Sequence, residues 1–74
     1  MLTVQNIDEA AAALEDEDGV PEGERDRFST AVAQAYSLAV TSDSGADREQ
    51  ARERMDPDVR KWFDLLIERV DRSS

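Results

Sequence analysis

The chain lacks the residues on which many small proteins depend for disulfide bonding, metal binding and acid–base catalysis. It contains no cysteine and no histidine among its 74 residues. The absence of cysteine excludes disulfide bonds and thiolate metal sites. The absence of histidine removes the usual imidazole ligand and the usual general base at neutral pH. Other residue types are scarce: one lysine, three glycines, two prolines and four aromatic residues.

Long apolar runs and catalytic motifs are missing as well. No stretch of about 18 apolar residues occurs, so we expect no membrane-spanning segment. The N-terminal sequence has neither the basic nor the apolar region of a secretory signal. No glycine-rich phosphate loop is present, and no serine has a histidine that could activate it. We therefore expect a cytoplasmic protein that is not an enzyme and that binds no cofactor or metal.

Negative charge is in excess, and it is unevenly distributed. The formal net charge is −9. Residues 1–27 carry nine acidic residues and two arginines, residues 28–42 carry no charge, and residues 43–74 carry nine acidic and seven basic residues. A strong negative charge repels phosphate backbones and anionic lipids. We therefore expect no direct binding to nucleic acid or to membranes.

The composition resembles that of proteins from salt-loving archaea and their viruses. Eight of the nine basic residues are arginine, and acidic residues and alanine are abundant. Carboxylates hold water in concentrated salt, whereas the long lysine stem adds exposed apolar surface. A GC-rich genome also favours arginine, alanine, aspartate and glycine, and it is the alternative explanation.

Apolar spacing predicts an all-α fold, because no stretch alternates with the period of a strand. We expect a single domain over residues 1–74, a small bundle of three to four helices with a short extended tail at residues 1–5. The helices are expected at about residues 6–17, 22–41, 45–55 and 57–71.

Capping and breaking residues predict the helix boundaries. Asn6, with Glu9 three residues later, is expected to cap the first helix, and Ser44 the third. Gly19 is expected to end the first helix. Pro57 is expected to separate the last two helices, because the residue before a proline is biased away from helical angles.

The helix over residues 22–41 carries small side chains on its apolar face. Ala31, Ala35 and Ala39 share this face, so a neighbouring helix could approach closely there. Because the residues from 28 to 42 are uncharged, this helix is expected to form the core.

The last helix has a wider apolar arc than the roughly 100° that a simple surface helix needs. Its main stripe consists of Val59, Phe63, Leu66 and Val70. Trp62 and Leu65 widen the arc. Tryptophan is enriched at binding hot spots, so we predict a partner-binding or self-association surface that comprises Trp62, Leu65, Phe63 and Tyr36. In the alternative, Trp62 closes the core beside Tyr36 and Phe28, with its indole N–H turned outward.

Seven acidic residues between positions 15 and 26 form an acidic patch. They are Glu15, Asp16, Glu17, Asp18, Glu22, Glu24 and Asp26. A calcium loop of the EF-hand type is excluded, because its first and last ligand positions are Leu14 and Arg25. Two interpretations are left: a solvated face, or an imitation of a nucleic-acid backbone that occupies the groove of a basic protein.

The basic residues of the C-terminal half are interleaved with acidic ones. Glu49 with Arg52, and Glu68 with Arg72, stand at the spacing of neighbours on one helix face. We therefore expect a surface of mixed charge there. As a whole, the sequence predicts a non-enzymatic protein–protein interaction module, a subunit or adaptor whose partner is another protein or a second copy. The alternative is an acidic inhibitor, a nucleic-acid mimic or an antitoxin-like protein that neutralises a basic partner.

Overall fold

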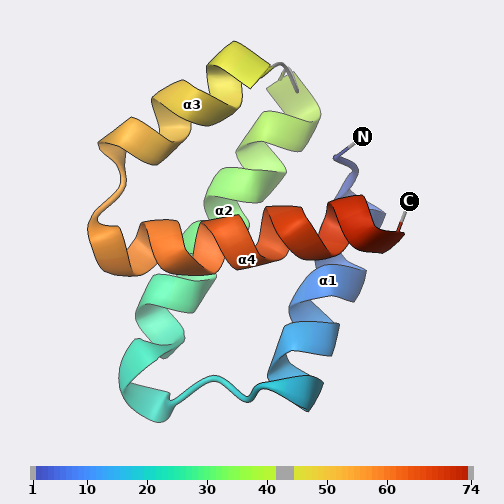
Figure 1. Cartoon of the computed structure of the whole chain (residues 1–74), viewed down its shortest axis with the longest axis vertical. Coiled ribbons are helices and arrows are strands. Elements are labelled where there is room, and N and C mark those ends of the chain that lie inside the picture. Colours follow the sequence, from blue (N-terminus) through green and yellow to red (C-terminus); the bar gives the residue numbers. More distant parts are fainter. Residues whose placement is uncertain (1, 42–44, 74) are drawn as a thin grey trace.

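The computed structural model describes residues 2–41 and 45–73, and all regular structure in these ranges is helical. Four α-helices and one short 3-10 helix follow one another along these ranges, and Figure 1 shows how the α-helices are arranged. They are α1 (Val4–Glu17), η1 (Glu22–Glu24), α2 (Arg25–Thr41), α3 (Gly45–Arg54) and α4 (Pro57–Ser73). The all-α bundle predicted from the sequence is confirmed. None of the helices in these ranges is long and apolar enough to cross a lipid bilayer.

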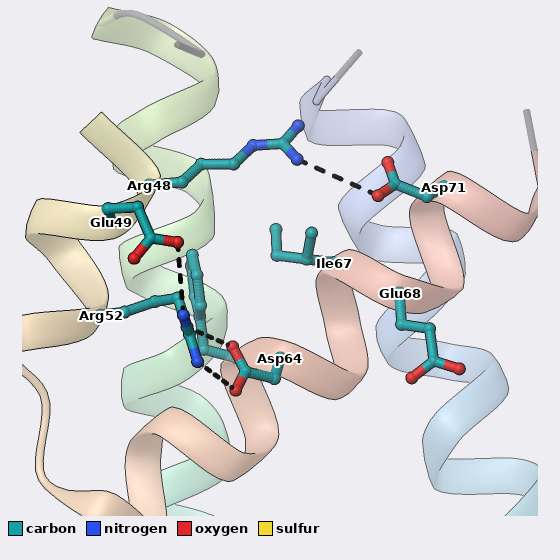
Figure 2. Close-up of a pocket in the computed structure, with 8 residues that line it drawn as sticks. Arg48, Glu49, Arg52, Asp64, Ile67, Glu68 and Asp71 are labelled. Atoms are coloured by element: carbon teal, nitrogen blue, oxygen red, sulfur yellow. Dashed lines mark hydrogen bonds and ion pairs between the residues drawn. The ribbon is translucent and has the colours of Figure 1, made fainter. Parts of the chain in front are cut away.

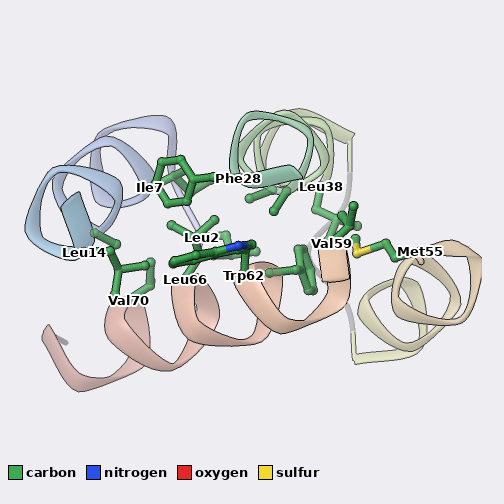
Figure 3. Close-up of a cluster of buried hydrophobic side chains, with 14 residues drawn as sticks. Leu2, Ile7, Leu14, Phe28, Leu38, Met55, Val59, Trp62, Leu66 and Val70 are labelled. Carbon is green, nitrogen blue, oxygen red and sulfur yellow. The ribbon is translucent and has the colours of Figure 1, made fainter. Parts of the chain in front are cut away.

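The helices are arranged in two layers. Helix α4 runs across α1 and α2 and packs against both. Helix α3 leads into the N-terminal end of α4, on the side away from α1, and packs against α2 (Figure 1). The molecule measures 30 × 26 × 17 Å along its principal axes. The shortest dimension corresponds to two layers of helices, since one helix is about 10 Å wide. Helix α4 therefore covers one face of the α1–α2 pair and leaves the opposite face uncovered in the described part of the chain (Figure 3).

The hydrophobic core lies between α4 and the α1–α2 pair (Figure 3). Ala31 and Ala35 of α2 are fully buried. Their small side chains let α4 approach α2 closely, as the sequence predicted, while Ala39 is half-buried. The whole cluster consists of Leu2, Ile7, Ala10, Leu14, Phe28, Ala31, Ala35, Leu38, Met55, Val59, Trp62, Phe63, Leu66 and Val70.

Helix α1 begins earlier than the sequence predicted. Thr3 is its N-cap, because the Thr3 hydroxyl oxygen accepts a hydrogen bond from the Asn6 backbone N–H at 3.0 Å. Asn6 therefore lies within the helix, and residues 4 and 5 are not part of an extended tail. The earlier start also brings Leu2 into the core, where its side chain is 3% exposed. Apolar spacing alone did not reveal this contact, since Leu2 precedes the helix.

Helix α2 begins at Arg25 rather than at residue 22, because residues 22–24 form the 3-10 turn η1, and α4 runs to Ser73 rather than to residue 71. The predicted end of the first helix and the predicted break before Pro57 agree with the structure. Gly19 has a φ of +74°, in the left-handed region that follows many helices. Its N–H and that of Asp18 both donate to the Leu14 carbonyl at 3.0 Å, which closes α1. The Arg60 N–H donates to the Asp56 carbonyl at 2.8 Å, so α4 starts as a separate helix. The cap expected at Ser44 lies outside the described residues.

Candidate interaction surfaces

Trp62 and Phe63 lie in the core rather than on a surface. Their exposed fractions are 4% and 0%. Phe28 meets the Trp62 ring edge-on, with ring centroids 5.3 Å apart and an interplanar angle of 88°. Because α4 crosses two helices, α1 and α2 together cover its wide apolar arc. Of the two placements that the sequence left open, the structure has the core one, and these two side chains form no exposed edge.

A core Trp62 was expected to turn its indole N–H outward to solvent, but in the structure this N–H is buried. Its Nε1 atom is buried and has no hydrogen-bond partner among the described residues. The ammonium nitrogen of Lys61 lies 5.1 Å from the centroid of the Trp62 ring. A cation at this distance is attracted by the π-electrons of the indole. Lys61 thus lies against the ring, and the tryptophan contributes packing rather than an accessible polar group.

Leu65 lies apart from the other predicted partner-binding residues. It is half-buried beside Leu14 in a small hollow of about 120 Å³. The remaining lining residues are charged: Asp18, Glu68, Arg69 and Arg72. Arg69 also pairs with Glu17 and so joins α4 to α1. Leu65 is therefore part of a charged surface.

Tyr36 lies in a groove of about 320 Å³ between α1 and α2. The Tyr36 hydroxyl donates a hydrogen bond to the Asp8 carboxylate on α1. This bond, together with partial burial and the negative charge of Asp8, raises the pKa of the phenol above its ordinary value of 10.0. The groove is also lined by Ala11, Glu15, Arg25, Phe28, Ser29, Val32 and Ala33. The hydrogen bond holds the tyrosine ring against α1.

The face of α2 that points away from α4 is exposed, and from Ser29 onward it carries no charged side chain. Ser29, Ala33 and Ser37 are exposed along it, and Val40 is 72% exposed. The sequence predicted that this neutral helix would form the core, but only one of its faces does. The uncharged stretch is visible in the sequence. Which half of it stays uncovered depends on where α4 crosses, and the sequence gives no signal for that.

The seven residues of the acidic patch surround the connection between α1 and α2, at the lower end of Figure 1. Three of them are paired with basic side chains: Glu15 with Arg25, Glu24 with Lys61, and Glu17 with Arg69. The other four are exposed and have no ion-pair partner among the described residues: Asp16, Asp18, Glu22 and Asp26. Over residues 2–41 and 45–73, no group of three acidic side chains is placed to hold a metal ion.

A cleft of about 370 Å³ lies between α3 and α4 (Figure 2). Arg52 donates to both carboxylate oxygens of Asp64, at 2.8 and 3.1 Å, and this bond raises the pKa of its guanidinium. Arg48 reaches Asp71 at 4.0 Å. The Ile67 side chain lies between these two bridges (Figure 2). The bridges span the cleft and attach α3 to α4.

Two of the ion pairs on the C-terminal half are those expected from helical spacing. Glu49 and Arg52 are 3.3 Å apart, and Glu68 and Arg72 are 2.6 Å apart. The bond between Arg52 and Asp64 was not predicted, because it joins two helices. Arg60 was not predicted either: it donates to the carbonyls of residues 52 and 55 at 2.9 and 3.2 Å, at the end of α3.

In comparisons with known proteins, no family model, no curated protein and no solved structure matches the chain. The charge and the shape of its surfaces are therefore the basis for a functional interpretation.

Proposed function

We propose that the chain is a small non-enzymatic protein–protein interaction module, a subunit or adaptor that binds its partner through the outward surface of α2. We call this surface the α2 face and define it by Ser29, Val32, Ala33, Tyr36, Ser37 and Val40. The observation that carries the proposal is an exposed helix face without charge in a chain of net charge −9. This surface replaces the edge around Trp62, which is buried.

The energetics of burial favour this face over the rest of the described surface. Burying a carboxylate without a partner is costly, and the centres of protein interfaces are depleted in charged residues and enriched in aromatic ones. The α2 face presents one aromatic ring and an exposed valine, Val40, with no ionisable group but the phenol of Tyr36. A partner that covers Ser29, Ala33, Ser37 and Val40 removes no carboxylate of α2 from water, and the Asp8 carboxylate at the edge of the face already accepts the hydrogen bond from Tyr36.

The proposed setting follows from the composition. We place the protein in the cytoplasm of a salt-loving archaeon or of a cell infected by one of its viruses, where abundant carboxylates keep it hydrated. The same charge disfavours direct contact with nucleic acid and anionic membranes. In this proposal the protein performs no catalysis and needs no cofactor or metal.

Site-specific photo-crosslinking in the native host tests the proposed function. A photoreactive residue is placed at Ala33, in the middle of the α2 face, and as a control at Glu53, which is exposed on α3. We expect discrete covalent adducts from position 33 and none from position 53. If position 33 yields no adduct at the protein's natural concentration, the proposed function is wrong.

A second candidate function is an acidic inhibitor that neutralises a basic protein, as a nucleic-acid mimic or in the manner of an antitoxin. The observation that favours it is the group of four exposed, unpaired carboxylates around the α1–α2 connection. Binding through them would weaken as salt is added, because exposed charges are screened. The test replaces Asp16, Asp18, Glu22 and Asp26 by their amides. If every detected interaction keeps its affinity and salt dependence, this candidate is excluded.

A further inference from the structure

We propose that the groove between α1 and α2 binds an amphipathic helix of a partner protein, with two basic residues seven positions apart and an apolar residue between them. This inference rests on the proposed function, because one wall of the groove belongs to the α2 face, and it names the kind of partner. Three features of the described residues carry it: an apolar middle of the groove, a carboxylate at each of its ends and the acidic charge around it.

The middle of the groove is apolar. Side chains of α1 and α2 line its volume of about 320 Å³, and no described side chain of α4 is among them. The middle is formed by Ala11 of α1 and by Phe28, Val32 and Ala33 of α2. A cavity of about 150 Å³ holds a benzene ring, so the groove has room for a large apolar side chain. The small Ala11 and Ala33 let the backbone of a partner come close.

Each end of the groove has a contact from α2 to a carboxylate of α1. At one end the Tyr36 hydroxyl donates a hydrogen bond to Asp8. At the other end a guanidinium nitrogen of Arg25 lies 3.5 Å from a carboxylate oxygen of Glu15. Asp8 and Glu15 are two helical turns apart, a distance of about 10 Å along α1. They therefore share one face of α1, with Ala11 between them.

This order of acid, apolar side chain and acid is complementary to one kind of helix surface. A helix that lies along α1 presents its positions i, i+3, i+4 and i+7 on a single face. Basic side chains at positions i and i+7 then meet Asp8 and Glu15, while the apolar side chain between them enters the groove. The opposite wall, which belongs to α2, carries no charge from residue 28 to residue 41. It therefore suits the uncharged flank of the same helix.

Both carboxylates can accept a hydrogen bond from a basic partner. A carboxylate has about four lone-pair sites, and the Tyr36 hydroxyl uses one of those on Asp8. The pair between Arg25 and Glu15 is long, and its two side chains are 61% and 46% exposed, so it contributes little to stability. A basic residue of the partner can therefore take the place of Arg25 beside Glu15 at little cost.

The charge around the groove favours a basic partner over an acidic one. Arg25 is the one basic side chain among the described residues that line the groove. Residues 1–27, which include α1 and the connection to α2, carry nine acidic residues and two arginines. The second arginine, Arg27, pairs with Asp58 of α4. An acidic helix is repelled by this surface, whereas a basic helix is attracted to it.

Fluorescence anisotropy of labelled peptides with the purified chain tests the inference. The probe is an alanine-based helical peptide with two arginines seven residues apart and leucines between them on the same face. One control peptide has glutamates in place of the arginines, and the other has serines in place of the leucines. We expect the probe to bind at least about tenfold tighter than either control, because the first control turns two attractive pairs into repulsive ones and the second cannot fill the groove. Equal binding of the probe and either control would overturn the inference.

Two neighbouring acidic residues separate the groove from general attraction to an acidic chain. Glu15→Gln and Asp16→Asn each change the net charge from −9 to −8, but only Glu15 lines the groove. We expect Glu15→Gln to weaken binding of the probe about threefold, because it removes one ion pair and leaves Arg25 to repel the peptide. Asp16→Asn should leave the affinity nearly unchanged. Equal affinities of the two variants would assign the binding to overall charge and overturn the inference. Both side chains are exposed, and circular dichroism checks that both variants are folded.

The two proposals fail in different ways. If position 33 gives an adduct in the host while the probe and its controls bind alike, the basic helix is excluded and the proposed function stands. If position 33 gives no adduct, the proposed function is wrong, whatever the peptides do.

Discussion

Among single residues, Gly19 and Gly23 differ in a property that composition does not reveal. Gly19 has a φ of +74°, whereas the φ of Gly23 is not positive. A methyl group added at either position would meet no atom within 4 Å. Any difference between alanine substitutions at the two positions therefore comes from backbone conformation and not from steric clashes.

We expect Gly19→Ala to lower the free energy of unfolding by about 1–2 kcal/mol, the usual cost of the left-handed conformation for a residue with a Cβ. Gly23→Ala is the control and should be neutral, or stabilise by up to about 1 kcal/mol by restricting the unfolded chain. Urea denaturation of both variants measures the difference. Equal effects would contradict the role of Gly19 as the stop of α1.

Tyr36 gives the protein a titration that can be followed directly, because it is the single tyrosine of the chain. Its hydrogen bond to Asp8 raises the pKa of the phenol above 10.0 in the folded state. Below that pH the phenol is protonated in both states, and the stabilisation is fully present. Above it, the unfolded chain loses the proton first. The free energy of unfolding therefore decreases as the pH rises through the folded-state pKa.

We expect tyrosinate absorbance of the folded protein to appear at a higher pH than in the unfolded chain. Asp8→Asn should shift the pKa back toward 10.0, because it removes the carboxylate that accepts the hydrogen bond of the phenol and, with it, the negative charge next to the phenol. Tyr36→Phe should abolish this part of the pH dependence of stability. An unshifted titration in the parent protein would show that the bond to Asp8 does not persist in solution.

Among the helices, α3 depends most on polar contacts, since Ala51 is its one side chain among the partly buried apolar residues that pack against the core in the described ranges. None of its residues is buried. Ten residues are too few for an isolated helix to be stable in water, so its contacts decide whether it forms. Its polar contacts include the bond from Arg52 to Asp64, the bridge from Arg48 to Asp71, and the two hydrogen bonds from Arg60 at its end, in addition to its packing against α2.

We expect Arg52→Gln to loosen α3 selectively. Amide hydrogens of residues 45–54 should exchange faster, while those of α1, α2 and α4 keep their protection. Global stability should decrease by about 1 kcal/mol or less, because the Arg52 and Asp64 side chains are 37% and 46% exposed. Arg72→Gln, which breaks an ion pair within α4, is the control. Unchanged exchange in α3 of the Arg52 variant would rule out this attachment.

For the molecule as a whole, the net charge of −9 opposes compaction. Salt screens this repulsion. We expect the free energy of unfolding to rise by about 1 kcal/mol from low to molar salt, which for a chain of this size raises the Tm by about 4–8 °C. The measurement is thermal unfolding of the parent chain at low and at molar salt.

Replacing the four unpaired acids of the acidic patch by their amides should flatten this salt dependence. Equal thermal stability of the parent chain at low and high salt would contradict both the importance of the repulsion and the proposed salt-loving source.

Local sequence signals predicted the helices and most of their ends. Gly19 and Pro57 were sufficient to locate two boundaries, because their effects depend on their own backbone geometry. The prediction failed at the first cap, where Thr3 and Asn6 are both capping residues and the choice between them depends on whether Leu2 reaches the core. That choice is decided by distant residues, and spacing along the chain does not contain it.

Residue types and their spacing within one helix were enough to predict the all-α fold, the net charge and the apolar arc of α4. What covers that arc depends on how the helices pack against one another, which spacing within one helix does not contain. Since α4 crosses both α1 and α2, Trp62 and Phe63 are buried and the outward side of α2 is left exposed. Spacing within one helix does not show whether these residues are buried or exposed, because their burial depends on which helices pack against them.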